Sequence, residues 1–179
     1  MNSPAADLLH ECEAEPCRGR IITLLLHVGR LLSEKNDIAA ALDSLVRDAT
    51  VVLDCSDNYA TRQAVNAACV RHNKPLVAGA VIQFDGQITV VDPRDARSPC
   101  YACIFPPDAE FEEVRCSTMG VFAPLVGVVG AMQAAEALKL IAEVGQSLAG
   151  RLLMLDGRAM EWNTMRVQRH ADCPVCVAR

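Results

Sequence analysis

Thr50-Val51-Val52-Leu53-Asp54-Cys55-Ser56-Asp57-Asn58 is the stretch that decides the expected fold of this chain. Its first part is β-branched and apolar without alternation, which is typical of a strand covered on both faces. Ser56-Asp57-Asn58 ends the strand, and a helical pattern follows over residues 59–72. Asp57 and Asn58 are therefore expected in a strand-to-helix turn, at the strand edge where open α/β sheets bind ligands.

The segments that follow extend this strand into a mixed sheet. Residues 76–82 form a second apolar strand, and parallel pairing is the default for such a βαβ unit. Asp-Gly pairs at 85–86 and 156–157 are strong signals for two-residue turns, so each predicts an antiparallel hairpin. The predicted fold class is α/β, with a Rossmann-like, mostly parallel sheet and an antiparallel edge made by hairpins.

Two helices flank this core in the sequence. The first follows Asp37, and its apolar residues share one face: Ile38, Ala41, Leu42, Leu45 and Val46. The second begins at Pro124 and runs to about Val144. Its first half is apolar all round, and Gly127 and Gly130 would allow another backbone to approach. This pattern indicates either a central buried helix or a subunit interface.

Composition excludes several classes of protein. The 179 residues suffice for one domain with a sizeable core, and a net charge of −5 without a basic run argues against a nucleic-acid partner. The longest apolar tract, residues 116–135, contains polar residues and three glycines, which indicates a buried helix rather than a membrane span. Nine cysteines behind a start that does not resemble a signal peptide predict a reducing, cytoplasmic location.

Two Cys-x-x-Cys pairs stand far apart, at Cys100–Cys103 and Cys173–Cys176. Together they supply four thiols, the number that a closed tetrahedral zinc site requires. The alternatives are two independent redox dithiols or four ordinary buried cysteines. Zinc is favoured because both pairs sit beside turn-forming residues rather than opening a helix, as thioredoxin-like pairs do. Such a structural zinc ion would attach the end of the chain to its middle.

The order of these features resembles the ThiF/MoeB/HesA family, the bacterial relatives of ubiquitin-activating enzymes. The residues that carry the resemblance are Leu53-Asp54-Cys55-Ser56-Asp57-Asn58, Arg62, Gly86-Gln87-Ile88-Thr89-Val90, Cys100-Tyr101-Ala102-Cys103, Cys116, Ala123-Pro124-Leu125-Val126-Gly127-Val128-Val129-Gly130 and Cys173-Pro174-Val175-Cys176. The resemblance runs from about Arg30 to the end. It implies a divergent segment at 1–29 and the C-terminal part of an adenylyltransferase domain at 30–179.

The resemblance implies a reaction and its cofactors. Family members adenylylate the C-terminal Gly-Gly tail of a ubiquitin-like sulfur carrier with ATP and Mg²⁺, in thiamine or molybdopterin sulfur transfer. By this resemblance Asp57 is the magnesium-associated acid, with Asn58 and Arg62 beside the phosphates. From the residues alone, Asp57 and Asn58 also suit a helix cap, and Arg62 also suits an ion pair with Asp57.

Cys116 matches a position where some family members carry a reactive cysteine that enters a covalent acyl-sulfur intermediate with the carrier. Adjacent Arg115 would favour the nucleophilic thiolate. The alternative is a loop cysteine without a catalytic role. The family is also dimeric, and the helix from Pro124 is the expected homodimer interface.

One motif of the family is missing from this sequence. The sequence contains no Gly-x-Gly-x-x-Gly turn of the kind that brings backbone N–H groups to phosphates. The expected fold is therefore truncated at its N-terminus, which leaves two hypotheses open. In the first hypothesis, the chain is a sulfur-carrier adenylyltransferase, which is a nucleotidyltransferase by family. In the second, it is a non-catalytic, zinc-stapled module that binds a sulfur carrier or a full-length homologue.

Overall fold

The computed structural model describes residues 38–108 and 119–177. The chain falls into two compact parts, Met1–Ala49 and Thr50–Arg179. In the first part the structure describes one helix, α3 (Ile38–Asp48). It confirms the amphipathic helix that the apolar spacing predicts.

The second part is built on a five-stranded sheet in which the strands follow one another in chain order. The strands are β1 (Val52–Asp54), β2 (Leu76–Ile82), β3 (Asp85–Val91), β4 (Arg151–Asp156) and β5 (Glu161–Arg166). β1 and β2 are parallel, as the βαβ pattern predicts, and the remaining pairs are antiparallel. The α/β class and both hairpins are confirmed, although antiparallel pairs outnumber parallel ones in the part of the sheet that the structure describes.

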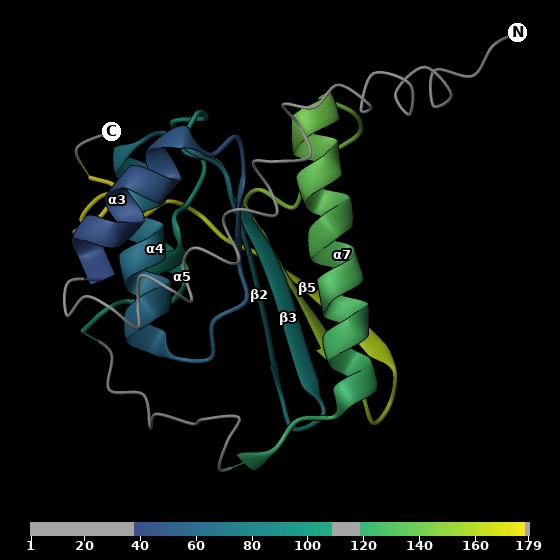
Figure 1. The fold of residues 1–179 in the computed structure, drawn as a ribbon. Helices are drawn as coiled ribbons and strands as arrows, with labels where there is room; N and C mark the ends of the chain where they lie inside the picture. The colour runs from purple at the N-terminus through teal and green to yellow at the C-terminus, as the bar shows by residue number, and fades with distance from the viewer. Residues whose placement is uncertain (1–37, 109–118, 178–179) are drawn as a thin grey trace, which may run out of the picture. The chain divides into compact units, whose positions relative to one another are not determined.

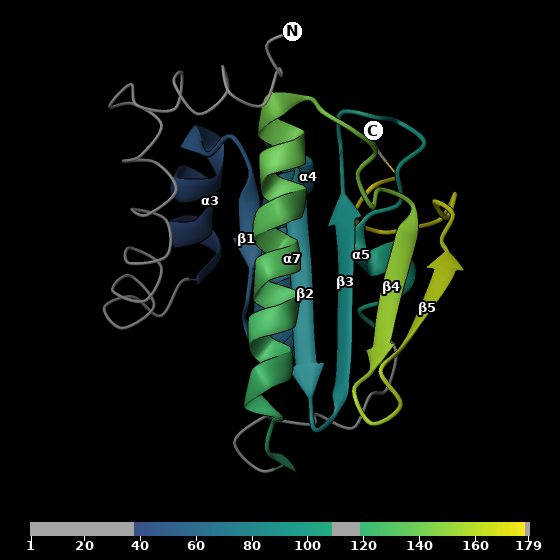
Figure 2. The same ribbon diagram turned by 90° about the vertical axis from the view of Figure 1, so that its right-hand side faces the viewer.

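Helices cover the two faces of this sheet. α4 (Tyr59–Arg71) and the short α5 (Tyr101–Ile104) lie on one side, and α7 (Ala123–Ala142) runs along the other (Figures 1 and 2). Between α7 and the sheet lies a hydrophobic core formed by Val51, Val77, Ile88, Val90, Ala137, Leu140 and Leu148. Burial of this apolar surface stabilises the sheet and aligns the strand ends that carry the site.

α7 is buried on one face only. Leu125 and Val129 pack inward, whereas Val126 and Val128 are exposed and a Cβ at Gly127 would meet no atom within 4 Å. The prediction of a central buried helix is therefore wrong, because within the described residues only one side of α7 meets the sheet. α7 is long enough and apolar enough, at a mean hydropathy of 1.5, to cross a membrane, a weak sign for a helix whose inner face packs on a sheet.

The Asp-Gly pairs do not form the turns that the sequence predicts. β2 and β3 pair up to Ile82 and Asp85, so their two-residue turn is Gln83-Phe84, with Gln83 in the left-handed region at φ 47°. Gly86 instead lies inside β3, where its missing side chain leaves room for Val129, whose Cγ2 would stand 3.1 Å from a Cβ. Packing against α7, rather than backbone freedom, accounts for this glycine.

The second Asp-Gly pair lies at the start of a longer connection instead of forming a two-residue turn. Asp156 still pairs with Glu161, so residues 157–160 form the connection between β4 and β5. Gly157 donates its N–H to the Phe84 carbonyl at 2.7 Å, and a Cβ at Gly157 would lie 2.7 Å from that same oxygen. This glycine permits a close approach between the two hairpin tips.

Candidate active site and candidate metal site

A pocket of about 1030 Å³ opens at the carboxyl ends of β1 and β2. Its wall includes residues of the turn after β1, of α4, of β2 and of α7, as well as Tyr101 and Phe105. Such volumes accommodate a cofactor-sized ligand. The pocket occupies the edge where the sequence predicts ligand binding.

The turn between β1 and α4 presents one acid to this pocket. Asn58 caps α4, because its Oδ1 accepts a hydrogen bond from the Thr61 N–H at 2.8 Å. Asp57 is exposed, and among the described residues its carboxylate takes part in no hydrogen bond or ion pair. The capping role thus belongs to Asn58, and Asp57 remains available for a ligand.

Arg62 is turned away from Asp57 and into the protein. Its guanidinium donates to the carbonyls of Gly79, at 3.0 Å, and of Ser56. It also lies 3.8 Å from the buried Asp54 carboxylate, whose other oxygen accepts the Ser56 N–H at 2.9 Å. The ion pair expected with Asp57 is therefore formed with Asp54 instead. Arg62 thus joins the end of β1 to the middle of β2 while still lining the pocket.

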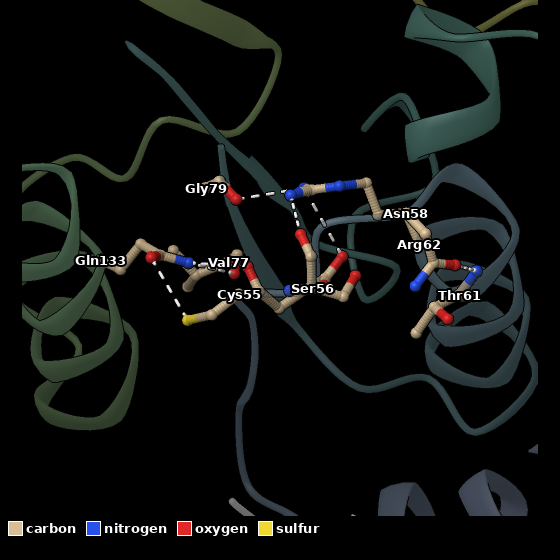
Figure 3. A network of polar contacts seen from close by, with 9 residues as sticks. Cys55, Ser56, Asn58, Thr61, Arg62, Val77, Gly79 and Gln133 are labelled. Carbon is tan, nitrogen blue, oxygen red and sulfur yellow. Dashed lines mark hydrogen bonds and ion pairs between the residues drawn. The ribbon is translucent and has the colours of Figure 1, made fainter. Parts of the chain in front are cut away.

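Gln133 of α7 contacts β1 and β2 from the opposite face of the sheet (Figure 3). Its Nε2 donates to the carbonyls of Asp54, at 2.9 Å, and of Val77, at 3.2 Å. The Cys55 thiol donates to its Oε1 at 3.5 Å, and partial burial together with the Asp54 carboxylate raises the pKa of this thiol. Gln133 approaches so closely that a Cβ at Gly79 would lie 2.5 Å from its Cδ.

The four cysteines of the two Cys-x-x-Cys pairs converge. Their sulfur atoms all lie within 4.8 Å of one another, and the separations are 3.9 Å for Cys100–Cys103, 3.6 Å for Cys100–Cys173 and 3.6 Å for Cys103–Cys176. Disulfide sulfurs would be about 2.05 Å apart. A tetrahedral four-thiolate site with metal–sulfur bonds of about 2.3 Å has edges of about 3.8 Å. The four sulfurs therefore fit a metal ion, and not two independent redox pairs.

One detail of the cysteine prediction is wrong. Cys100 caps the short helix α5, so the first pair does open a helix, contrary to the sequence expectation. The arrangement nevertheless differs from a solitary redox dithiol, because the sulfurs of Cys173 and Cys176 meet those of the first pair and all four side chains are buried.

The charges around the cysteines suit a bound cation. Burial and the neighbouring thiolates of Cys103 and Cys176 raise the pKa of Cys100. Burial also acts to raise the pKa of Cys176, but hydrogen bonding to Arg169 and to the other cysteines outweighs it and lowers this pKa to about 7. Four buried thiolates repel one another unless a positive ion compensates them.

Arg169 joins the loops that carry the two pairs. Its Nη1 donates to the Ala96 carbonyl at 2.8 Å, and its Nη2 donates to the Cys176 carbonyl. The backbone N–H of His170 adds a hydrogen bond to the Cys103 sulfur at 3.5 Å. Backbone donors of this kind orient a sulfur ligand and stabilise its negative charge.

The sequence reading missed Gln133, Asp54 and Arg169. A signal for Gln133 was available, because it is a polar residue on the stripe of α7 that also carries Leu125, Val129 and Leu140. Nothing local distinguishes Arg169 from the other arginines near the C-terminus. Cys116 lies outside the described residues, so its role stays a prediction.

Comparison with known proteins identifies relatives of this chain. A family model described as the ThiF family matches residues 20–175. The sulfur carrier protein ThiS adenylyltransferase of Escherichia coli is 44% identical over 136 residues, which are 76% of this chain and 53% of that protein. The molybdopterin-synthase adenylyltransferase of Salmonella typhimurium is 40% identical over 136 residues, or 76% of this chain and 54% of that protein. The chain thus spans about half the length of these relatives.

Solved structures show the same fold. The crystal structure of Escherichia coli MccB with ATP superimposes with a TM-score of 0.64 at 21% identity, and the match covers 80% of this chain and 44% of that one. The order of strands, the turn with Asp57 and the converging cysteines thus occur in a chain whose sequence matches one family model over most of its length. The chain belongs to the ThiF family.

Proposed function

We propose that this chain takes part in the ATP-dependent adenylylation of the C-terminal glycine of a ubiquitin-like sulfur-carrier protein. Two relatives are named adenylyltransferases, one of them for the sulfur carrier ThiS. The observation that carries the proposal is the exposed Asp57 carboxylate at the rim of a pocket of about 1030 Å³. It is the acid that this site leaves free for a ligand among the described residues.

The proposed reaction is a nucleotidyl transfer. A carboxylate oxygen of the carrier's terminal glycine attacks the α-phosphorus of ATP, a new oxygen–phosphorus bond forms, and the bond to pyrophosphate breaks. The products are an acyl-adenylate and pyrophosphate. Catalysis of such transfers depends mainly on positioning and on compensation of phosphate charge.

Each residue in or near the turn has a separate proposed role. Asp57 would hold Mg²⁺, which takes carboxylate and phosphate oxygens as ligands and would compensate charge on the triphosphate. Asn58 caps α4, and Arg62 and Gln133 join the end of β1 to β2. Arg62 and Gln133 therefore position the turn. Cys116 is proposed as a thiol that receives the activated acyl group from the adenylate, with release of AMP.

We further propose zinc as the metal of the four cysteines. Zn²⁺ favours tetrahedral four-thiolate sites and is redox-inert, and a site closed by four protein ligands leaves no position for a substrate. The role of Cys100, Cys103, Cys173 and Cys176 would then be structural. Zinc content of the purified protein, at one ion per chain, tests this assignment.

ATP–pyrophosphate exchange tests the proposed reaction directly. The purified chain is incubated with a sulfur carrier, ATP, Mg²⁺ and labelled pyrophosphate, and incorporation of label into ATP is measured. Exchange is expected with the native chain and is expected to fall at least about a hundredfold in Asp57→Asn, because a metal-bound carboxylate is lost. Asp85→Asn, which changes an exposed acid on β3, is the matched control.

A second candidate is a non-catalytic module that binds a sulfur carrier or a full-length homologue. One observation favours it: the cation nearest to Asp57 along α4, Arg62, is committed to Asp54 and to backbone carbonyls. This module would bind the carrier without ATP and would show no exchange. Exchange that depends on Asp57 rules it out.

The exposed face of α7 is the proposed homodimer interface. Val128 and Leu138 are exposed on α7 without lining the pocket, and Gly127 leaves open space beside Val128. Sedimentation of the full chain is expected to show a dimer, and Leu138→Glu, a change outside the pocket lining, is expected to dissociate it. A monomeric native chain would contradict this part of the proposal.

A further inference from the structure

The short helix α5 contributes to both sites at once. Cys100 caps it and Cys103 lies within it, so two of the four sulfurs come from this single turn. Tyr101 of the same helix and Phe105 directly after it line the pocket. The candidate metal site and one wall of the pocket are therefore parts of one structural unit.

Side chains on one face of α4 form hydrogen bonds with this unit. The Tyr59 hydroxyl lies 2.8 Å from the Phe105 carbonyl and 2.6 Å from the Pro106 carbonyl, and Gln63 Nε2 donates to the Phe105 carbonyl at 2.7 Å. One turn further along, Asn66 Oδ1 accepts the Tyr101 N–H at 2.9 Å. Residues four and three positions apart share a helix face. The hydrogen bonds of all three side chains depend on the position of the backbone of α5 and of the two residues after it.

Tyr59 connects this contact to the turn that carries Asp57. It is the first residue of α4 and stands next to the cap residue Asn58. Displacement of Tyr59 would loosen the first turn of α4, since the N–H groups of Thr61 and Arg62 bond to Asn58 there. The opposite end of the turn is held by the Asp54–Arg62 pair.

α5 is too short to be stable as an isolated helix. It has four residues, and a single helical turn is unfavourable by itself because nucleation costs more than its hydrogen bonds return. Its neighbours Cys173 and Cys176 belong to a segment without helix or strand. Metal–sulfur bonds across the two segments would supply the missing restraint.

We propose that metal held by the four cysteines fixes α5 as a wall of the pocket, and that Tyr59 is the positioning residue that transmits this restraint to the turn carrying Asp57. The metal site then prepares the pocket for its ligand instead of only stapling the chain. Where that ligand is ATP, the inference rests on the proposed function.

Hydrogen exchange of the full chain tests the coupling without any substrate. The zinc-loaded protein is compared with protein stripped by a chelator, and the amides of Thr61 and Arg62 report on the first turn of α4. Their exchange is expected to accelerate at least about tenfold on metal removal, because this turn opens locally. The amides of Ile88 and Val90 in the core strand β3 report on global unfolding and are expected to stay protected.

Variants assign the effect to Tyr59. In zinc-loaded Tyr59→Phe, Thr61 and Arg62 are expected to exchange about as fast as in the stripped native chain, and stripping should add less than about twofold. Gln63→Leu should give a smaller acceleration, since Tyr59 still reaches the Phe105 carbonyl. Cys55→Ser, which alters a pocket thiol outside this contact, is the control and should behave like the native chain.

The outcomes separate this inference from the proposed function. Unchanged exchange at Thr61 and Arg62 after verified metal loss overturns the coupling, and a loaded Tyr59→Phe that behaves like the native chain overturns the role of Tyr59. If stripping unfolds the whole chain, loaded Tyr59→Phe alone decides. ATP binding is measured in parallel: a chain that binds no ATP but still shows the exchange changes retains the coupling and loses only the proposed nucleotide.

Discussion

The four-cysteine site and the pocket differ in how completely the described residues build them. Four sulfurs converge within 4.8 Å, and three of their separations, at 3.9, 3.6 and 3.6 Å, are close to the edge length of a tetrahedral metal site. In the pocket, by contrast, Arg62, Asp54, Asn58 and Gln133 are all engaged in holding the end of β1, its neighbour β2 and the start of α4. Asp57 is the acid that the described residues of the turn between β1 and α4 leave for chemistry, beside the Ser56 hydroxyl, which has no hydrogen-bond partner among the described residues.

This difference shows that neighbouring polar residues can have opposite roles. A charged residue that is nine-tenths buried needs a partner inside the protein, because leaving water is costly. Arg62 and Asp54, which are 8% and 4% exposed, form an ion pair at 3.8 Å, and each also hydrogen-bonds to the backbone. Asp57 stays in water, where an ionised carboxylate carries no such cost. Burial thus separates the residues that support the site from the one that can serve it.

Removal of a sulfur ligand is expected to have the largest effect. Cys103→Ser and Cys176→Ser should each abolish metal binding and lower the free energy of unfolding by roughly 3 kcal/mol or more, because metal-binding energy is folding energy in such sites. Metal analysis and urea denaturation measure the two quantities. Cys55→Ser should retain metal and stability, and equal losses in that control would contradict the assignment.

Removal of the arginine comes next. Arg62→Met leaves the buried Asp54 carboxylate without its partner, and we expect a loss of about 3–5 kcal/mol in the free energy of unfolding. Adding Asp54→Asn removes the uncompensated charge and should recover part of this loss. A double variant as unstable as Arg62→Met would show that the carbonyl contacts of Arg62, rather than its ion pair, dominate.

Gly79→Ala probes the other side of the sheet with a smaller change. The new Cβ would stand 2.5 Å from the Gln133 side chain, so that side chain must move away from the carbonyls it holds. We expect a loss of about 1–3 kcal/mol. In a Gln133→Ala background the same methyl group no longer meets the three close atoms of the Gln133 side chain and should cost less, as chemical denaturation of the four proteins can test.

The Cys55 thiol should give the smallest effect, a change of reactivity alone. Its pKa is raised above the ordinary 9.0 by partial burial and by Asp54, so less thiolate is present at neutral pH than in an unstructured cysteine. Alkylation by iodoacetamide, followed by mass spectrometry of the peptide containing Cys55, should therefore be slow at pH 7.5. Its rate should still be rising at pH 9, and a plateau below that pH would contradict this expectation.

Much of the fold is predictable from local patterns. The β1–α4–β2 unit appears where the apolar run, the Ser56-Asp57-Asn58 break and the next apolar run place it, because strand and helix periodicities are properties of neighbouring residues. The positions of the hairpins are predictable for the same reason. Their turns are not, since Gly86 and Gly157 serve contacts with Val129 and with the Phe84 carbonyl. Those partners lie far away in the sequence.

By itself, the sequence determined the order of the elements, the two Cys-x-x-Cys pairs and the acid at the end of the first strand. Only the tertiary structure decided that sulfurs 73 residues apart lie 3.6 Å from each other, that Arg62 faces Asp54, and that Gln133 reaches β1 and β2 from α7. The physical reason is that local patterns report which face of an element is apolar. Which polar groups meet across those faces depends on how the elements pack, and a pattern of neighbouring residues contains no record of that.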